Sequence, residues 1–294
     1  MTIRNVYYEI TSFHTLMIAD THVSKGKREN TERLRFYDNR EGNLEEISTL
    51  LRAGKVPKVE YHSFYVYVPK VRKVIFIDYW SKVVQRAIYD VLNPKICRTF
   101  IEHTYACVKG RGQLAAMEQL YTWMRETRTS GTEWYYYKFD VAKFFYRIDH
   151  EILMDICRKK IDDPRTVDLL GYYINNDAVP FGMPLDANQL TITEEQMLYD
   201  LGIPIGGGLS HMLGNMYLDP LDQFCKRVLG IKRYIRYMDD IIILDNDKER
   251  LKEYGRRMTQ FLEERLHLNF NSKTALRIIK ILVPSFTARS IKRC

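Results

Sequence analysis

Cysteine is scarce in this chain, and its spacing argues against two kinds of stabilisation. The five cysteines stand at positions 97, 107, 157, 225 and 294, and no two of them form a CxxC pair. Structural zinc sites and disulfide frameworks both need cysteines at short, regular spacings. We therefore expect free thiols in a reducing, cytoplasmic environment, with neither a zinc centre nor a disulfide-stapled fold.

Long apolar runs are missing as well. No uninterrupted stretch approaches the roughly 20 apolar residues of a membrane span, although 46% of the 294 residues are hydrophobic. The N-terminal segment MTIRNVYYEITSFHTLMIAD contains Arg4 and Glu9 and lacks a small-residue cleavage site, so it does not resemble a signal peptide. Internal repeats and low-complexity tracts are also lacking. The composition predicts a compact chain with a large core and no membrane partner.

The sequence does contain an excess of positive charge, and this excess is unevenly placed. The net charge is +8, and residues 1–112 hold 19 Lys and Arg against 12 Asp and Glu, a balance of +7. Within this region Lys70, Arg72 and Lys73 stand beside a β-rich segment. The region is either an ordinary solvated basic face or a surface that holds a polyanion such as nucleic acid.

Helical and strand patterns mix along the chain without βαβ regularity, which is typical of the α+β class. Apolar residues at helical spacing predict helices, and short aromatic or β-branched runs predict strands. We expect a partly helical region over 10–55, helices over 81–92, 112–127, 149–160, 209–229 and 248–267, strands near 64–69, 73–78 and 133–142, a loop over 178–200, and a hairpin over 233–247.

The hairpin RYIRYMDDIIILDND places two adjacent carboxylates, Asp239 and Asp240, between two apolar runs. They could simply be turn residues. Hairpin turns favour Asn-Gly or Asp-Gly, however, and two like charges repel. A divalent magnesium ion, which takes oxygen ligands, would offset that repulsion.

A third carboxylate, Asp140, ends the buried strand WYYYKFD about 100 residues earlier. Alone, it could be a helix cap or a turn residue. Together with the Asp-Asp hairpin, it could hold two magnesium ions about 3.5–4 Å apart. Such a pair of ions serves phosphoryl transfer by positioning and charge neutralisation.

The order of these motifs resembles a reverse transcriptase over nearly all of residues 20–274. Four segments resemble the family's successive palm motifs: YYKFDVAKFFYRIDH, GIPIGGGLSHMLGNMYLDPLD, YMDD and LHLNFNSKT. A fifth, FYVYVPKVRKVIFI, resembles the fingers hairpin whose basic residues bind phosphates. The resemblance implies an RNA-directed DNA polymerase, a nucleotidyltransferase that uses dNTPs to extend a DNA or RNA primer on an RNA template.

The resemblance also implies roles for individual residues. Two Mg²⁺ ions, with Mn²⁺ as a substitute, would be held by Asp140, Val141, Asp239 and Asp240, and Lys273 would lie near the triphosphate and protonate pyrophosphate. The expected nucleotide contacts are Lys70, Arg72, Lys73, Val141, Phe145, Ile205 and Gly206. The expected template–primer contacts are Arg111, Gly207, Ser210, Tyr237 and Met238.

Two of these expectations have a simple steric basis and a plainer alternative. An aromatic ring at Phe145 would collide with a 2′-hydroxyl and select deoxynucleotides, or it would be one core aromatic among several. Gly206 and its two neighbouring glycines would let the backbone approach a base pair, or they would form a flexible loop before a helix capped near Ser210. His103, His150 and His211 lack ligand spacing and are interpreted as structural or as facing nucleic acid.

The same resemblance predicts a right-hand polymerase architecture. We expect a fingers-rich region over residues 1–130 and a palm over 131–274. The tail, 275–294, is short where the family continues with a primer-grip hairpin and a helical thumb, so the thumb is expected to be largely missing. Truncation, a frameshift, a completing partner and divergence are open explanations. An inactive, thumbless nucleic-acid-binding remnant is the alternative to an active polymerase.

Ile205 points to a subclass. Most reverse transcriptases have Gln before the second motif's glycine, whereas Ile there is typical of bacterial and phage diversity-generating retroelements, whose pattern is IGxxxSQ. This chain reads IGGGLSH, with His211 at the last position. The resemblance implies a prophage or bacterial retroelement that copies a template-repeat RNA with a small basic accessory protein. Retron, group II intron and phage-defence enzymes are alternatives.

Overall fold

The computed structural model describes residues 2–26, 30–68, 72–188, 191–271 and 274–278. The chain forms two compact units, each made of separate stretches. The first unit contains residues 1–99 and 150–213, and the second contains 100–149 and 214–294. Helices and strands are mixed, which is compatible with the predicted α+β class. The division into fingers over 1–130, palm over 131–274 and a short tail stays a prediction.

The first unit is mainly helical. Its longest helix, α5 (Tyr79–Cys97), buries an apolar stripe that includes Val83, Ala87 and Val91, and it packs against α1, α2 and α3. The other elements are β1 (Ile3–Arg4), α1 (Tyr7–Ile10), α2 (Phe13–Ser24), α3 (Thr31–Tyr37), α4 (Arg40–Arg52), β2 (Tyr61–Val66), β3 (Arg72–Ile77), α8 (His150–Lys160), β5 (Ile161–Asp162), α9 (Pro164–Ile174) and η1 (Glu194–Gln196).

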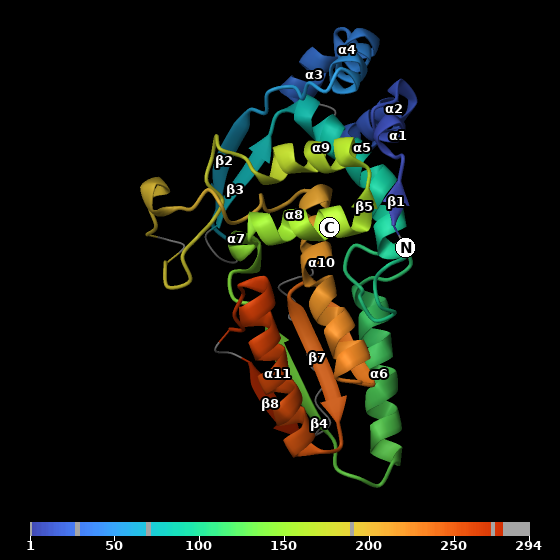
Figure 1. Ribbon diagram of the computed structural model, residues 1–294, viewed down its shortest axis with the longest axis vertical. Coiled ribbons are helices and arrows are strands. Elements are labelled where there is room, and N and C mark those ends of the chain that lie inside the picture. The colour runs from blue at the N-terminus through green and yellow to red at the C-terminus, as the bar shows by residue number, and fades with distance from the viewer. Residues whose placement is uncertain (1, 27–29, 69–71, 189–190, 272–273, 279–294) are drawn as a thin grey trace. The chain divides into compact units, whose positions relative to one another are not determined.

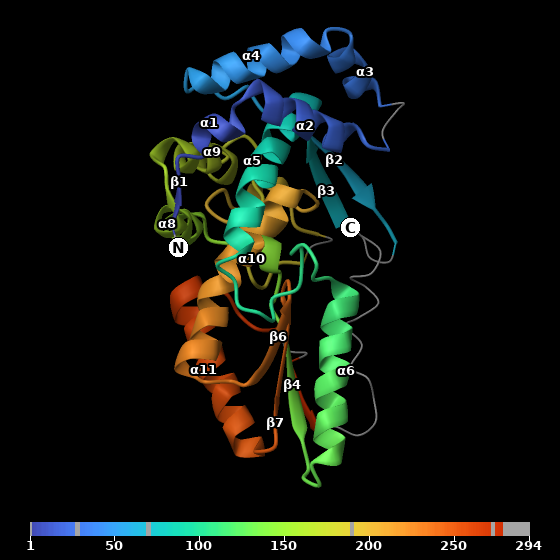
Figure 2. The same ribbon diagram turned by 90° about the vertical axis from the view of Figure 1, so that its right-hand side faces the viewer.

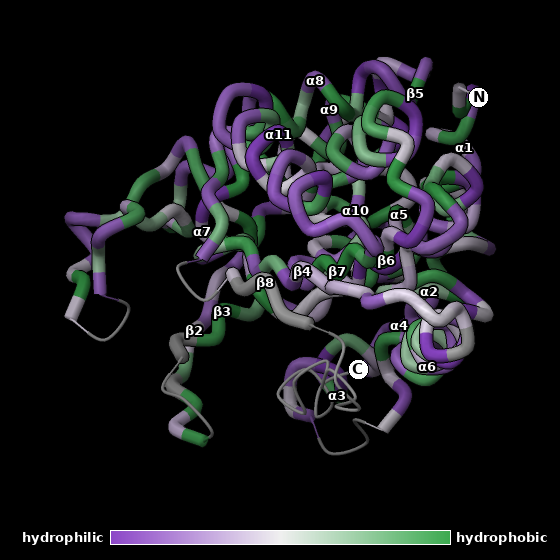
Figure 3. Tube along the Cα trace, turned by 90° about the horizontal axis from the view of Figure 1, so that it is seen from below, coloured by the Kyte–Doolittle hydropathy of each residue, from purple (hydrophilic) through white to green (hydrophobic). Residues whose placement is uncertain are grey.

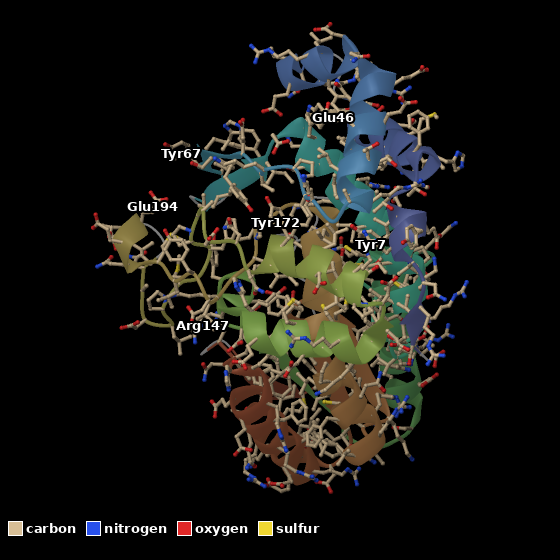
Figure 4. The ribbon with its side chains drawn as sticks, turned by 45° about the horizontal axis from the view of Figure 1, so that its top comes forward. Tyr7, Glu46, Tyr67, Arg147, Tyr172 and Glu194 are labelled. Carbon is tan, nitrogen blue, oxygen red and sulfur yellow. The ribbon has the colours of Figure 1, made fainter. Side chains whose placement is uncertain are left out.

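Buried polar side chains tie these helices together. Asp20 on α2 has no exposed surface and accepts hydrogen bonds from the Tyr79 hydroxyl at 2.6 Å and from Arg40 Nε at 2.7 Å. Of two tyrosines labelled in Figure 4, the buried Tyr7 donates to the Leu51 carbonyl near the end of α4, and the exposed Tyr172 donates to the Pro57 carbonyl at 3.2 Å. Satisfied buried polar groups of this kind specify one packing arrangement.

The second unit is built on a four-stranded antiparallel sheet of order β6-β7-β4-β8, of which β7, β4 and β8 are labelled in Figure 1. The strands are β4 (Tyr135–Asp140), β6 (Arg233–Tyr237), β7 (Asp240–Asp245) and β8 (Ala275–Ile278). The run Ile241–Ile243 in β7 is fully buried. Because successive residues of a strand face opposite sides, this run indicates that both faces of β7 are covered.

Two helices cover the two faces of this sheet (Figure 2). Helix α6 (Gln113–Thr129) closes one face through a cluster that includes Leu120, Trp123, Ile235 and Ile242. Helix α11 (Lys248–Leu266) covers the other face and is largely hydrophilic along the rest of its surface (Figure 3). A Cβ on Gly255 of α11 would lie 2.7 Å from Cε1 of Tyr137, so glycine permits this close approach.

The remaining elements connect to the sheet, and they bring corrections to the sequence expectations. These elements are α7 (Phe144–Arg147), α10 (Gly208–Gln223) and η2 (Phe224–Val228). The helix expected over 209–229 is α-helical only to residue 223 and ends in a π-helical turn. Ser210, expected near the cap, is the third residue of α10. Residues 275–278 form the edge strand β8.

Among the described helices, none has the length and apolar composition that crossing a bilayer requires. Four of the cysteines, at positions 97, 107, 157 and 225, are free thiols.

Candidate active site

The three aspartates predicted from the sequence gather at one end of the second unit's sheet. Asp140 is the last residue of β4 and Asp240 is the first residue of β7, and the two are direct cross-strand partners. Opposed residues of an antiparallel pair have Cα atoms about 4.5–5.5 Å apart. The turn between β6 and β7 consists of Met238 and Asp239, so only one aspartate of the pair lies in the turn itself.

The turn has a backbone conformation that is unusual for its residue type. Met238 has φ of 52°, in the left-handed region, which costs a residue with a Cβ roughly 1–2 kcal/mol. Two contacts fix it there. Arg236 Nη1 donates to the Met238 carbonyl at 3.0 Å, and the amide of Val141 donates to the Asp239 carbonyl at 3.3 Å. Strain retained in this way is characteristic of functional turns.

The electrostatics of this edge are dominated by negative charge. Burial, and then the neighbouring charges of Asp240 and Asp140, raise the pKa of Asp239 to about 7. Asp240 is 8% exposed, and its Oδ1 lies 3.0 Å from Nζ of Lys138. Lys138 stands two residues before Asp140 on the same face of β4, which brings its ammonium group to this edge.

Asp140 is held by the segment that follows α11. Asn271 Nδ2 donates to Asp140 Oδ2 at 3.1 Å, and the Asn271 amide donates to the Asp140 carbonyl at 2.7 Å. Among the described residues, no group of three or more His, Cys, Asp or Glu side chains is already arranged to hold a metal ion. The donor set nevertheless fits a hard divalent cation, because it consists of carboxylate oxygens, and burial together with their mutual repulsion raises the pKa of Asp239.

Phe145 follows Asp140 by five residues and belongs to the same unit. Lys143, two residues earlier, also has a left-handed backbone, with φ of 50°, and is the N-cap residue directly before the short helix α7. The rings of Phe144 and Phe145 are 5.1 Å apart. Helix α10 approaches them at Gly214, where a Cβ would lie 3.1 Å from one ring and 3.3 Å from the other. The half-buried Phe145 ring is therefore confined by its surroundings.

The residues expected from the second motif lie in the first unit. Ile205, Gly206, Gly207 and Ser210 line a cavity of about 370 Å³, together with residues 74–77 of β3 and the cations Lys25, Lys82 and Arg86. Gly206 has φ of 118°, a conformation that side chains rarely adopt. Lys82 and Arg86 pair with Glu32 and Asp90 at 3.3 and 2.8 Å.

Several predicted contact residues have structural partners. Arg111 Nη1 donates to the carbonyls of Ile101 and Thr104, at 2.9 and 3.3 Å, and so helps to close its own loop. Tyr237 packs against the apolar cluster beneath α6. Burial lowers the pKa of both His103 and His211, and the ring of His150 hydrogen-bonds the Gly202 carbonyl at 2.6 Å. The nucleic-acid roles of Arg111, Tyr237 and Met238 stay predictions.

Two predicted residues, Lys70 and Lys273, lie outside the described residues. For Arg72 and Lys73 the structure describes the backbone alone, which pairs with Val66 and Tyr65 of β2.

Sequence reasoning missed three residues of this edge: Lys138, Asn271 and Arg236. Strand alternation could have found Lys138, because residues two apart on a strand share a face. The sequence spacing of Asn271 and Arg236 does not predict which residues they contact. Both depend on how distant segments come together in the folded unit.

The family model for reverse transcriptase (RNA-dependent DNA polymerase) matches residues 56–278, which is more than half of the chain. The chain belongs to the reverse transcriptase family. No curated protein matches the chain in sequence. As a member of the family it is an RNA-directed DNA polymerase, a nucleotidyltransferase whose substrates are a nucleic acid template, a primer and dNTPs. Members of this family generally use divalent metal ions, and the Asp140–Asp240 edge carries the ligand chemistry that such ions need.

Proposed function

We propose that this reverse transcriptase transfers nucleotides by two-metal catalysis, with Mg²⁺ held by Asp140, Asp239, Asp240 and the backbone of Val141, and with Mn²⁺ as a substitute. The observation that supports this most directly is that Asp140 and Asp240 are direct cross-strand partners with Asp239 in the adjoining turn, where burial and these two carboxylates raise its pKa. Such an edge is stabilised by binding a cation.

Bound Mg²⁺ would supply the charge that lowers the pKa of the primer 3′-hydroxyl and neutralises the triphosphate. The protein's own part is to hold the carboxylates in place. Asn271 orients Asp140, and Lys138 pairs with Asp240. The Lys138 contact is made to Asp240 Oδ1, and the carboxylate could ligate a cation through its other oxygen while the ammonium stays nearby as a positive charge.

The remaining predicted residues receive substrate roles in the same proposal. Phe145 excludes a 2′-hydroxyl, and Lys273 protonates the leaving pyrophosphate. The other nucleotide contacts are Lys70, Arg72, Lys73, Ile205 and Gly206, and the template–primer contacts are Arg111, Gly207, Ser210, Tyr237 and Met238.

We further propose that the enzyme belongs to a diversity-generating retroelement, where it copies a template-repeat RNA with a small basic accessory protein. Ile205 supports this assignment, because it gives the cavity in the first unit apolar bulk where Gln would offer a hydrogen-bonding amide. Losing a directional contact narrows the discrimination between right and wrong base pairs. A retron, group II intron or phage-defence enzyme is the second choice.

Primer extension on poly(rA)/oligo(dT) tests the polymerase proposal. We expect dTMP incorporation in MgCl₂ or MnCl₂, none in EDTA, and recovery when excess Mg²⁺ is restored. Incorporation that persists in EDTA would contradict metal catalysis.

Single-nucleotide misincorporation on an RNA template tests the retroelement assignment. Ile205→Gln should lower the error rate, most strongly opposite adenine, by about fivefold if one hydrogen bond of about 1 kcal/mol is regained. Ile205→Val keeps an apolar side chain and is the matched control, with an unchanged error rate. If the Gln and Val variants share one error spectrum, the fidelity argument is wrong.

A further inference from the structure

A buried polar network lies behind the Met238–Asp239 turn, within the second unit. At its centre Arg236 and Asp222 form an ion pair in which neither side chain has any exposed surface. Arg236 Nε donates to Asp222 Oδ1 at 2.8 Å, and Nη2 donates to Oδ2 at 2.6 Å. The Tyr234 hydroxyl, at 2.6 Å, and the Thr104 hydroxyl, at 2.9 Å, donate to the same carboxylate.

The third nitrogen of the guanidinium points elsewhere. Arg236 Nη1 donates to Asn215 Oδ1 at 2.9 Å and to the Met238 carbonyl at 3.0 Å. Asn215 is itself fixed, because its Nδ2 donates to the Ala106 carbonyl at 2.8 Å. The guanidinium is thus held in one orientation by Asp222 and Asn215, and it presents one donor to the turn.

Core stability alone is a weak explanation for this arrangement. A fully buried ion pair gains little over well-packed apolar side chains, since desolvating two charges offsets their attraction. The contact to Met238 is different, because Met238 is the residue with the left-handed backbone and it directly precedes Asp239. A planar guanidinium bound on two sides is a rigid anchor for that carbonyl.

We propose that Arg236 is a positioning residue for the reaction: anchored by Asp222 and Asn215, it holds the Met238 carbonyl and so fixes the turn that presents Asp239 and Asp240. The inference rests on the proposed metal-binding role of these aspartates. It assigns to the buried network a function in presenting ligands, as supporting hydrogen bonds do at metal sites.

Tyr234→Phe is the matched control. Tyr234 is as buried as Arg236 and bonds the same Asp222 oxygen, but no contact joins its hydroxyl to the turn. The test variants are Arg236→Lys, which keeps the charge without the guanidinium fork, and an apolar replacement, Arg236→Met with Asp222→Leu and Tyr234→Phe. The apolar variant removes the ion pair without leaving a buried charge unpaired.

Two readouts are needed. Hydrogen exchange of a peptide covering residues 236–241, in metal-free protein, reports the turn directly. Mn²⁺ titration followed by electron paramagnetic resonance reports metal affinity. We expect Arg236→Lys and the apolar variant to exchange at least about tenfold faster in this peptide and to bind Mn²⁺ about 10–100-fold more weakly, whereas Tyr234→Phe matches the wild type in both.

The proposal is overturned if the folded Arg236 variants match Tyr234→Phe in both readouts. It is equally overturned if Arg236→Lys and the apolar variant both fail to fold while Tyr234→Phe folds, because the network would then serve folding as a whole. If wild-type protein binds no Mn²⁺, the metal proposal fails. The exchange measurement still decides whether Arg236 holds the turn.

Discussion

Strand β7 has an aspartate at each end, and the two carboxylates have different charged neighbours. At one end Asp245 is gripped by Arg250, whose Nε lies 3.0 Å from Oδ2 and whose Nη2 contacts Oδ1. At the other end Asp240 shares the edge with Asp140 and Asp239 and contacts Lys138 at one oxygen. Within a single strand, the carboxylate at one end pairs with a half-exposed arginine, whereas the carboxylate at the other end pairs with Lys138 and also belongs to a cluster of three carboxylates.

Two carboxylates beside these ends, Asp247 and Asp239, have pKa values shifted in opposite directions. Hydrogen bonds from the amides of Arg250 and Glu249 lower the pKa of Asp247, which caps α11 near the Arg250 end. Burial and two like charges raise that of Asp239 at the opposite end. A carboxylate that serves structure has its charge satisfied within the protein. A carboxylate whose charge remains uncompensated is suited to an external cation.

The largest difference is expected for removing one carboxylate from each end. Asp239→Ala should reduce primer extension by at least about a thousandfold, because losing roughly 4 kcal/mol of transition-state stabilisation has that effect. Asp245→Ala, the same change at the other end of β7, should stay within about twofold of wild type, since its ion pair is partly exposed. RNA binding, measured by filter retention, should be nearly unchanged in both.

Equal loss of activity in the two variants would break the comparison, because it would make the effect one of sheet stability. Thermal melts of both proteins separate these explanations. A folded Asp239→Ala that retains activity would remove the two-metal proposal.

The second difference concerns pH and metal-free protein. Because the pKa of Asp239 is about 7 when folded and near 3.8 when unfolded, the folded state binds this proton more tightly between those values. The contribution of Asp239 to the free energy of unfolding should therefore be fully present at a pH below its unfolded pKa and should be lost as pH rises through about 7, by up to about 4 kcal/mol. Urea unfolding in EDTA at several pH values measures it.

Asp239→Asn is the control for this experiment, because it keeps the side-chain shape and cannot titrate. Its unfolding free energy should lose that decline. Asp247 contributes in the opposite sense, since its lowered pKa adds stability that is present at neutral pH and is lost under acid. An unchanged pH profile in Asp239→Asn would show that another group is responsible.

Much of this edge was predictable from short-range patterns. Alternating and apolar runs located β4, β7 and α11, and the aspartates stood out because charges interrupt those runs. Strand alternation also puts Lys138 on the face of Asp140. Its pairing with Asp240 needs the register that sets Lys138 opposite Ile242, and one residue of slippage would turn it to the other face.

The rest of the edge depends on contacts between distant segments. Asn271 reaches Asp140 across 131 positions, and Thr104 reaches Asp222 across 118. No periodicity encodes either contact. The left-handed backbone of Met238 could not be predicted either, because turn statistics favour Gly or Asn at such a position. The hydrogen bond from Arg236 to its carbonyl forms only after β6 and α10 have packed.

The smallest expected difference is between the two cations. Lys138→Met removes the ammonium beside Asp240, where the two side chains are 23% and 11% exposed, and should cost about 2 kcal/mol of unfolding free energy in EDTA, between the exposed and buried limits. Arg250→Met removes the partner of Asp245 from an exposed surface and should cost about 0.5 kcal/mol of unfolding free energy.

Adding Mg²⁺ should distinguish the two variants further. It should reduce the loss in Lys138→Met, because a bound cation replaces the missing charge, and it should leave the loss in Arg250→Met unchanged. Urea unfolding of both variants in EDTA and in MgCl₂ measures the four values. If Mg²⁺ restores neither variant or both alike, the two ends of β7 do not differ in their demand for a cation.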